Sequence, residues 1–238
     1  MSDPLRAVIL AGGLGMRLRP YTTILPKPLV PVGDRPILEH IIRRLHASGV
    51  RTVDLCVGHL GELIRVYFNE GTVLPEHLDV EWHWEPGEPL GTAGALRVVP
   101  RLEGTFLAMN GDILTTLDYR ALMEHHHRAG TVLTIAVQRK RVDIDLGVLD
   151  IDDGRVAAFH EKPTLDYNVS MGIYAYESRV LDYLPDGACQ FPELVQRLLD
   201  AGEAISVYRS DDDWFDIGTI GEYERAVAEV ERRGGWAA

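Results

Sequence analysis

A short apolar run that ends in glycines most constrains what this chain can fold into. Residues 7–11, Ala-Val-Ile-Leu-Ala, are followed by Gly12, Gly13 and Gly15 and then by Arg17. An apolar run that stops at glycines is typical of a buried strand leading into a tight loop. Because glycine has no side chain, the N–H groups of such a loop can approach a ligand closely and suit a phosphate or a nucleotide. The sequence therefore predicts a buried strand with a phosphate site at its end.

Two cations follow the loop and match this interpretation. Arg17 carries a planar fork of donors, and Lys27, which lies between two prolines, carries a compact charge. An ordinary glycine turn beside two surface cations is the alternative for a lone loop. Two other phosphate motifs fit poorly: Gly-Lys-Ser/Thr of the P-loop is absent, and Leu18 stands where the dinucleotide fingerprint needs its third glycine.

Helices and strands alternate through the first half of the chain. Apolar spacing predicts helices over 36–48 and 60–68, the second closed by Gly71, and strands over 52–57 and 78–84. This alternation favours a parallel α/β sheet with right-handed crossovers, whose ligands bind at the carboxyl ends of the strands. The glycine loop lies at such an end.

The pattern changes after residue 131. Strands are predicted over 132–137, 147–151, 155–160 and 170–176, with few helices between them. Residues 152–154, Asp-Asp-Gly, are typical of a hairpin turn. We expect an antiparallel extension that covers the nucleotide half of the protein and holds an acceptor substrate. Further helices are expected over 92–98, 117–128 and 178–184.

Several acidic residues and histidines are candidate metal ligands. Asp112 follows an apolar strand and Gly111, a position that suits a hard cation such as Mg²⁺, although a turn or helix cap is the alternative. The run His125–His127 points in three directions on a helix, so we expect a solvated surface there. Residues 211–213, three aspartates, are interpreted as an exposed turn.

Several separated motifs together resemble those of the sugar-1-phosphate nucleotidyltransferases, the nucleoside-diphosphate-sugar pyrophosphorylases. The resemblance spans about residues 7–224 and is closest to mannose-1-phosphate and heptose-1-phosphate guanylyltransferases. The motifs are Gly-Gly-Leu-Gly-Met-Arg-Leu at 12–18, Pro-Lys-Pro at 26–28, Glu-Pro-Leu-Gly-Thr-Ala-Gly at 88–94, Glu-Lys-Pro at 161–163, Ser-Met-Gly-Ile-Tyr at 170–174 and Trp-Phe-Asp-Ile-Gly-Thr at 214–219.

The resemblance implies one catalytic domain over residues 1–238. Its fold would be a Rossmann-like three-layer αβα domain with a mixed, mainly parallel sheet and a small antiparallel sugar-binding extension. Residues 1–130 would form the nucleotide-binding half, 131–218 the acceptor-binding part and 219–238 a C-terminal helix. No acyltransferase-like extension follows in the sequence, so we expect a stand-alone catalytic unit.

The implied reaction joins a nucleoside triphosphate to a sugar 1-phosphate and releases pyrophosphate. In the family pattern, Asp112 and Asp216 would hold Mg²⁺, and Arg17 would stabilise the leaving pyrophosphate. Lys27 would neutralise charge near the α-phosphate, and Lys162 would bind the sugar's phosphate.

The resemblance also implies two sets of binding residues. The nucleotide set is Leu10, Ala11, Gly12, Gly13, Gly15, Glu85, Gly91 and Thr92. The sugar-phosphate set is Gly147, Glu161, Lys162, Ser170 and Gly172.

The base and the acceptor are argued from two departures from the family pattern. By the resemblance, Glu85 aligns with a Gln of thymidylyl- and many uridylyltransferases. A carboxylate only accepts hydrogen bonds, which favours the two adjacent donors of guanine. Ser170 stands where many members have Asn, so the sugar is not transferable by analogy; a mannose or heptose type is favoured. The alternatives are a uridylyl-, thymidylyl- or cytidylyltransferase, including one for a non-sugar phosphate, and a non-catalytic nucleotide-sugar-sensing subunit.

Composition limits the kinds of partner that this chain is expected to bind. A net charge of −12 disfavours a broad nucleic-acid surface, which would need many cations. With two cysteines, neither a disulfide framework nor a zinc site is indicated. We find no signal peptide and no apolar run long enough for a bilayer, so we expect a cytoplasmic protein with no membrane partner. Family members are often dimers or tetramers, which makes a homo-oligomer one expectation.

Overall fold

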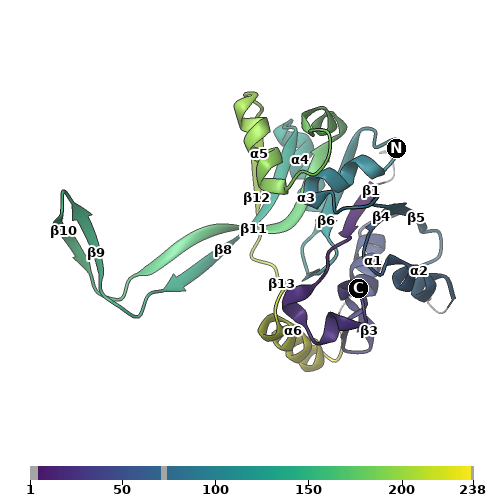
Figure 1. Cartoon of the computed structure of the whole chain (residues 1–238), viewed down its shortest axis with the longest axis horizontal. Helices are drawn as coiled ribbons and strands as arrows, with labels where there is room; N and C mark the ends of the chain where they lie inside the picture. Colours follow the sequence, from purple (N-terminus) through teal and green to yellow (C-terminus); the bar gives the residue numbers. More distant parts are fainter. Residues whose placement is uncertain (1–4, 71–73, 237–238) are drawn as a thin grey trace.

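A seven-stranded mixed sheet lies at the centre of the molecule (Figure 1), in a computed structural model that describes residues 5–70 and 74–236. Its strand order is β12-β8-β11-β6-β1-β4-β5. The strands are β1 (Leu5–Ala11), β4 (Val50–Val57), β5 (Asp79–Trp84), β6 (Thr105–Asn110), β8 (Leu133–Asp143), β11 (Thr164–Glu177) and β12 (Ile205–Arg209).

One strand breaks the parallel pattern of this sheet. β1 pairs in parallel with β4 and β6, and the edge pairs β4–β5 and β12–β8 are parallel too. Only β11 runs antiparallel to its neighbours β6 and β8. The sheet is therefore mixed and mainly parallel, as the sequence predicted.

Helices cover both faces of the sheet. The α-helices are α1 (Ile37–Ala47), α2 (Gly61–Glu70), α3 (Gly91–Gly94), α4 (Tyr119–Ala129), α5 (Phe191–Asp200) and α6 (Ile220–Arg233). Successive residues of β1 point to opposite faces, so Ile9 packs in the core beneath α1 and α2, whereas Val8 packs in the core beneath α5. Because both faces are buried, the strand is apolar from Ala7 to Ala11. The three-layer αβα prediction is confirmed.

Short elements complete the body of the protein. Two small ribbons pair β2 (Pro31–Val32) with β3 (Arg35–Pro36), and β7 (Ile113–Thr115) with β13 (Trp214–Asp216). The helix expected over 92–98 divides into α3 and a 3-10 helix, Ala95–Val98, and the one expected over 178–184 is a 3-10 helix, Ser178–Tyr183. Gly71, the expected stop of α2, lies outside the described residues.

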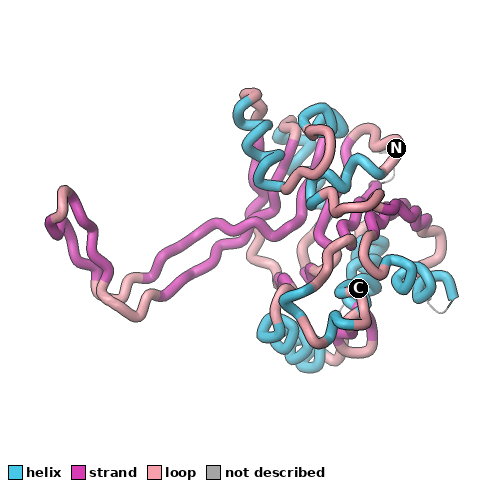
Figure 2. The backbone as a smooth tube through the Cα atoms, viewed as in Figure 1, coloured by secondary structure: helices cyan, strands magenta, loops and turns pink. Residues whose placement is uncertain are grey.

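The antiparallel extension is a long arm that projects from the body (Figures 1 and 2). β8 and β11 continue well past the predicted limits 132–137 and 170–176. At the far end β9 (Val148–Asp152) and β10 (Arg155–His160) form the predicted hairpin, with Asp153 and Gly154 at positive φ in its turn. Residues 138–169 are called the arm below. The expectation that this extension covers the nucleotide half of its own chain is wrong, because the β8–β11 pairing continues outward without folding back.

The histidine run on α4 is another correction. His126 is buried, and its Nδ1 lies 2.7 Å from the hydroxyl oxygen of Thr134 on β8. The helix therefore turns one histidine into the core, although His127 is exposed as expected. Among the described residues, none of the helices combines the length and the apolar composition that crossing a membrane requires.

Candidate functional site

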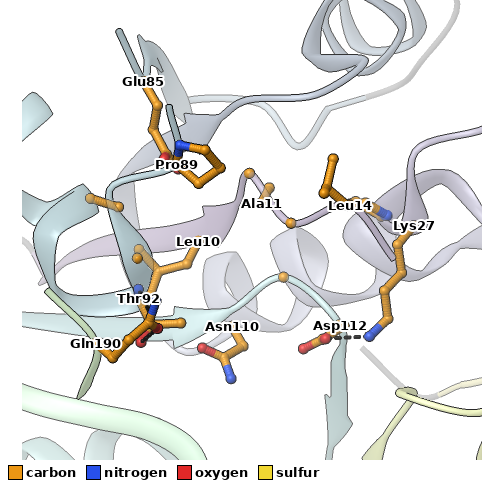
Figure 3. Close-up of a pocket in the computed structure, with 16 residues that line it drawn as sticks. Leu10, Ala11, Leu14, Lys27, Glu85, Pro89, Thr92, Asn110, Asp112 and Gln190 are labelled. Atoms are coloured by element: carbon orange, nitrogen blue, oxygen red, sulfur yellow. Dashed lines mark hydrogen bonds and ion pairs between the residues drawn. The ribbon is translucent and has the colours of Figure 1, made fainter. Parts of the chain in front are cut away.

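A cavity of 370 Å³ opens at the carboxyl ends of β1 and β6 (Figure 3). Parallel neighbours end at the same edge of a sheet, so the loops that follow these two strands face each other across the opening. The glycine loop after β1 forms one wall. The lining residues are Leu10, Ala11, Gly12, Gly13, Leu14, Lys27, Pro28, Glu85, Pro89, Gly91, Thr92, Ala95, Asn110, Gly111, Asp112 and Gln190.

Glycine at position 12 allows Glu85 to approach the loop. A Cβ on Gly12 would collide with Oε1 of Glu85. The other carboxylate oxygen of Glu85, Oε2, accepts a 2.7 Å hydrogen bond from the backbone N–H of Leu90. The Glu85 backbone N–H in turn donates 3.1 Å to the carbonyl of Val57, at the end of β4. The carboxylate is therefore held in place beside the loop backbone.

The opposite wall is built from α3 and the start of α5. Gly91 has φ +79°, and a Cβ there would lie 2.6 Å from the carbonyl oxygen of Cys189. The hydroxyl of Thr92 accepts a 3.0 Å hydrogen bond from the Phe191 N–H. These contacts place Thr92 and Gln190 in the cavity wall, as Figure 3 shows.

Seven of the lining residues were not among the predicted site residues. They are Leu14, Pro28, Pro89, Ala95, Asn110, Gly111 and Gln190. Gln190 and Glu193 form a capping box at the start of α5. A Gln followed three residues later by Glu is a readable helix-start signal. It locates the helix, but it does not reveal that the helix end faces this cavity.

The two predicted metal carboxylates come from distant parts of the chain. Asp112 follows β6, and Asp216 ends β13, which pairs with β7 so that Asp216 lies opposite Ile113. The N–H of Ile217 also donates a 3.0 Å hydrogen bond to the carbonyl of Asp112. The β7–β13 ribbon therefore brings Asp216 close to Asp112, which lines the cavity.

Charge is concentrated around this pair. Lys27 forms an ion pair with Oδ2 of Asp112, drawn in Figure 3. The other oxygen, Oδ1, is buried and has no hydrogen-bond partner among the described residues. Burial, and next the charge of Asp112, raise the pKa of Asp216, while Lys27 and Arg17 oppose that rise. An unpartnered carboxylate oxygen with a second acid close enough to influence its charge is donor chemistry that fits a divalent cation.

Arg17 lies at the outer end of the same site. A second cavity of 260 Å³ is lined by Arg17 together with Lys27 and Asp112, which also line the first. A Cβ on Gly218 would lie 3.4 Å from Nη2 of Arg17 and 3.5 Å from Oδ1 of Asp216. The two cavities therefore share Gly13, Lys27 and Asp112 and together extend from the glycine loop to Arg17.

The Ser-Met-Gly-Ile-Tyr motif borders the cavity floor. Gly172 has φ +71°, and a Cβ there would lie 2.8 Å from Nδ2 of Asn110. Its N–H donates 3.3 Å to the Ser170 hydroxyl, which donates 3.4 Å to the hydroxyl of Tyr174. Burial raises the pKa of Tyr174 to about 12, and the charges of Asp112 and Asp216 add to this rise, so the phenol is a neutral group beside the acids.

Three predicted sugar-phosphate residues are not brought to this site. Gly147 lies on the arm, where a Cβ would collide with the ring of Phe159. Glu161 and Lys162 follow β10 near the arm's far end, and both are exposed. Their roles stay predictions from the resemblance.

A separate group, on β4 and β5, also has metal-ligating atoms within reach of one another. One ligand atom each from Asp54, Glu81 and His83 lies within 4.8 Å of the others. Asp54 is already paired with Arg6, at 2.6 and 2.9 Å, and with His83 at 2.7 Å. This buried carboxylate is neutralised by protein groups, so its environment does not call for a cation.

A protein-family model and several known proteins match nearly the whole chain. The family model described as "Nucleotidyl transferase" matches residues 6–233. A UTP–glucose-1-phosphate uridylyltransferase of Synechocystis sp. is 30% identical over 96% of this chain. A D-glycero-alpha-D-manno-heptose 1-phosphate guanylyltransferase of Aneurinibacillus thermoaerophilus is 30% identical over 95% of this chain and 99% of its own length. This chain spans 64% of the length of the Synechocystis relative.

A solved structure supports the same relationship. HddC from Yersinia pseudotuberculosis, in a complex with GMP-PN, superposes with a TM-score of 0.72 and 26% identity, covering 94% of this chain and 99% of HddC. The similarity therefore extends over the body and the arm together.

Proposed function

The chain belongs to the nucleotidyl transferase family, and we propose that it transfers a nucleoside monophosphate from a nucleoside triphosphate to a sugar 1-phosphate. The relatives described above are named as sugar-1-phosphate nucleotidyltransferases. The products are a nucleoside-diphosphate sugar and pyrophosphate. GTP is the proposed donor, and a manno-configured sugar, mannose or heptose, is the proposed acceptor. The observation that carries the proposal is the cluster of Lys27, Asp112 and Asp216 at one end of a glycine-walled cavity.

The chemistry is a displacement at phosphorus. An oxygen of the sugar's phosphate forms a bond to the α-phosphorus of the triphosphate. The bond from that phosphorus to the β-phosphate oxygen breaks, and pyrophosphate leaves with the electron pair. Both reactants are anions, so the protein's contribution is positioning and charge neutralisation rather than covalent chemistry.

The residues divide this work according to their positions. The backbone from Leu10 to Gly13 bounds the nucleotide, and Lys27 lies where the cavity meets Asp112. Arg17, at the outer end of the second cavity, binds the pyrophosphate end of the triphosphate. Lys162 is the proposed partner of the sugar's phosphate, although it lies on the arm.

Asp112 and Asp216 are the proposed ligands of Mg²⁺. The buried, unpartnered Oδ1 of Asp112 and the neighbouring carboxylate of Asp216 fit a hard cation with oxygen ligands. When bound, such an ion neutralises negative charge that develops on the phosphate oxygens. Lys27 supplies a positive charge at the same carboxylate.

Glu85 is the residue that supports GTP. Its carboxylate is fixed by the Leu90 N–H and lies across the cavity from Thr92 and Gln190. A carboxylate only accepts hydrogen bonds, and guanine presents two adjacent donors, N1–H and N2–H₂. The Synechocystis relative, named as a UTP enzyme, keeps uridylyl transfer as the second candidate.

The direct test is pyrophosphate release with Mg²⁺. GTP, UTP, dTTP, CTP and ATP are each offered with a panel of sugar 1-phosphates, including glucose, mannose and heptose types. Preferential turnover of GTP with a manno-configured phosphate supports the proposal. Turnover of another pair keeps the reaction and corrects the base or the sugar. Nucleotide binding without turnover of any pair contradicts sugar-1-phosphate transfer and favours a non-sugar acceptor or a sensing subunit. The cytoplasmic location predicted from the sequence is a separate expectation.

A further inference from the structure

The proposed site is split within one chain. Tyr174, beside Asp112 and Asp216, lies on the body end of β11, whereas Lys162 lies beyond the other end of this strand. The ten residue steps from Thr164 to Tyr174 span about 33 Å of extended strand. In this arrangement Lys162 cannot contact a phosphate bound at Asp112 of the same chain.

The base of the arm is held on both sides, so its direction is fixed. On one side β12 pairs with β8 as far as Val137, and the Gln138 side chain donates 2.7 Å to the carbonyl of Asp212. On the other side the indole N–H of Trp214 donates 3.0 Å to the carbonyl of Met171. Beyond this base, seven consecutive pairs join Ser170–Val137 to Thr164–Asp143. The arm therefore projects away from the body of its own chain (Figure 2).

The far end of the arm has an uncovered apolar face. Leu149 lies opposite Phe159, and Ile151 lies opposite Val156. Leu149 and Ile151 are two residues apart, so all four side chains share one face of the β9–β10 hairpin. Ile151 is 69% exposed and Phe159 is 61% exposed. An isolated two-stranded hairpin is marginal in water, and this one needs a surface to cover its apolar face.

The same chain carries a second uncovered apolar surface, beside its site. The loop after β1 exposes a set of large apolar side chains, among which Ile24 is 77% exposed and Met16 is 58% exposed. Leu14 lines the main cavity, and Met16 lines the cavity that contains Arg17. We call this set the rim: Leu14, Met16, Tyr21, Ile24 and Leu25.

We propose that two copies of this chain exchange arms, so that the apolar face of each β9–β10 hairpin packs on the rim of the other copy. Glu161 and Lys162 of one copy then complete the site that holds Asp112 of the other. The occupant of both surfaces is a second copy, because each chain offers both halves of the contact and one twofold axis covers all four surfaces at once. The proposal rests on the proposed function, since it assigns Lys162 to the sugar's phosphate.

Complementation between two damaged chains tests the exchange. Arg17→Ala has an intact arm and Lys162→Ala has an intact body; each alone should lose about a hundredfold or more of turnover. In a mixed dimer with exchanged arms, one of the two sites contains both intact residues. Random pairing of equal amounts should therefore restore about a quarter of the wild-type rate. Mixed dimers that stay as inactive as the parents would overturn the exchange, as would a Lys162→Ala variant with normal turnover.

A measurement of oligomeric state tests the apolar contact independently of activity. Phe159→Asp should convert a wild-type dimer into a folded monomer, seen by light scattering and circular dichroism. Leu199→Asp is the matched control, because Leu199 is an exposed apolar residue on α5, outside both the arm and the rim. A monomeric wild type, or a Phe159→Asp dimer as stable as the control, would overturn the proposal.

The two experiments separate this inference from the function on which it rests. Wild-type turnover without complementation rejects arm exchange and retains the nucleotidyltransferase. A wild type that turns over no pair of substrates rejects the proposed function, and the Phe159→Asp measurement still decides whether the arm joins two copies.

Discussion

The N–H of Ile217 donates a 3.0 Å hydrogen bond to the carbonyl oxygen of Asp112, and this bond joins the two halves of the acidic site. This bond adds one contact to the end of the β7–β13 ribbon, so that Asp216 lies beside the backbone next to Asp112. The two acids are separated by most of the second half of the chain, and their proximity depends on this short ribbon.

Asp112→Asn should abolish most turnover while leaving the fold intact. The amide removes a negative charge from beside Lys27 and Asp216, and with it the proposed cation ligand. Loss of one preorganised charge contact of this kind costs about a hundredfold or more in rate. The rate of pyrophosphate release, compared with the thermal unfolding midpoint of the same variant, checks this. Near-normal release would remove Asp112 from the mechanism.

Arg17→Ala should reduce turnover strongly, because it removes the charge proposed to bind the leaving pyrophosphate. Arg17 is exposed and lines the second cavity, so its removal should leave stability nearly unchanged. Arg19→Ala is the matched control, because Arg19 is an exposed arginine of the same loop that does not line either cavity. Equal rates for the two variants would show that Arg17 has no special role.

Glu85→Gln should weaken the preference for GTP over UTP. The amide still occupies the position beside Gly12, but it replaces one of the two acceptor oxygens proposed to select guanine with a donor. The ratio of kcat/KM for the two nucleotides measures the change, and Glu88→Gln, on the exposed part of the same loop, is the control. An unchanged ratio in Glu85→Gln would assign base selection to the backbone of the cavity wall.

Much of the nucleotide half was predictable because its signals are local. The apolar run of β1, the glycines after it and the helical spacing of α1 each fix a short segment, and the carboxyl-end rule then places Asp112 beside the glycine loop. Asp216 was placed by family resemblance alone. Its neighbours in sequence do not reveal that β13 pairs with β7.

The arm and the buried histidine were not predictable for a common reason. Alternation of apolar and polar residues indicates that a segment is a strand. It does not indicate whether a hairpin folds over the body or projects from it. Val142 and Leu165 look like interior residues in sequence, yet they pair with each other on the exposed arm. His126 looks like one member of a polar run, and only the packing of α4 against β8 buries it. Both depend on contacts between distant segments.

His126 should make the protein less stable as the pH falls. Burial lowers the pKa of His126 below its ordinary value of 6.5, although Glu177 opposes this. Below pH 6.5 the unfolded chain therefore binds a proton that the folded chain resists, and stability falls by up to about 1.4 kcal/mol per pH unit from this group. Above that pH the imidazole is neutral in both states and adds no slope.

Denaturant unfolding at pH 7.5, 6.5 and 5.5 measures this dependence. His126→Gln should show a shallower loss of stability between pH 6.5 and 5.5 than the wild type, whatever its stability at pH 7.5. His59→Gln, at an exposed histidine, should keep the wild-type slope. Parallel curves for all three proteins would assign the acid sensitivity to other groups.

Gly172→Ala should destabilise the protein by two additive effects. Gly172 has φ +71°, which an alanine adopts at a cost of about 1–3 kcal/mol. Its Cβ would also lie 2.6 Å from Cδ1 of Ile113 and 2.8 Å from Nδ2 of Asn110, and such overpacking costs a further ~1–3 kcal/mol. Gly202→Ala separates the effects, because Gly202 has nearly the same positive φ, +75°, and a Cβ there meets no heavy atom within 4 Å. Unfolding free energies from urea titrations should therefore fall more in Gly172→Ala than in Gly202→Ala. Turnover should fall only in the former, since Asn110 lines the cavity and must shift to admit the methyl group. Equal losses of stability would mean that the backbone conformation alone requires glycine at position 172, and that Asn110 accommodates a side chain without moving.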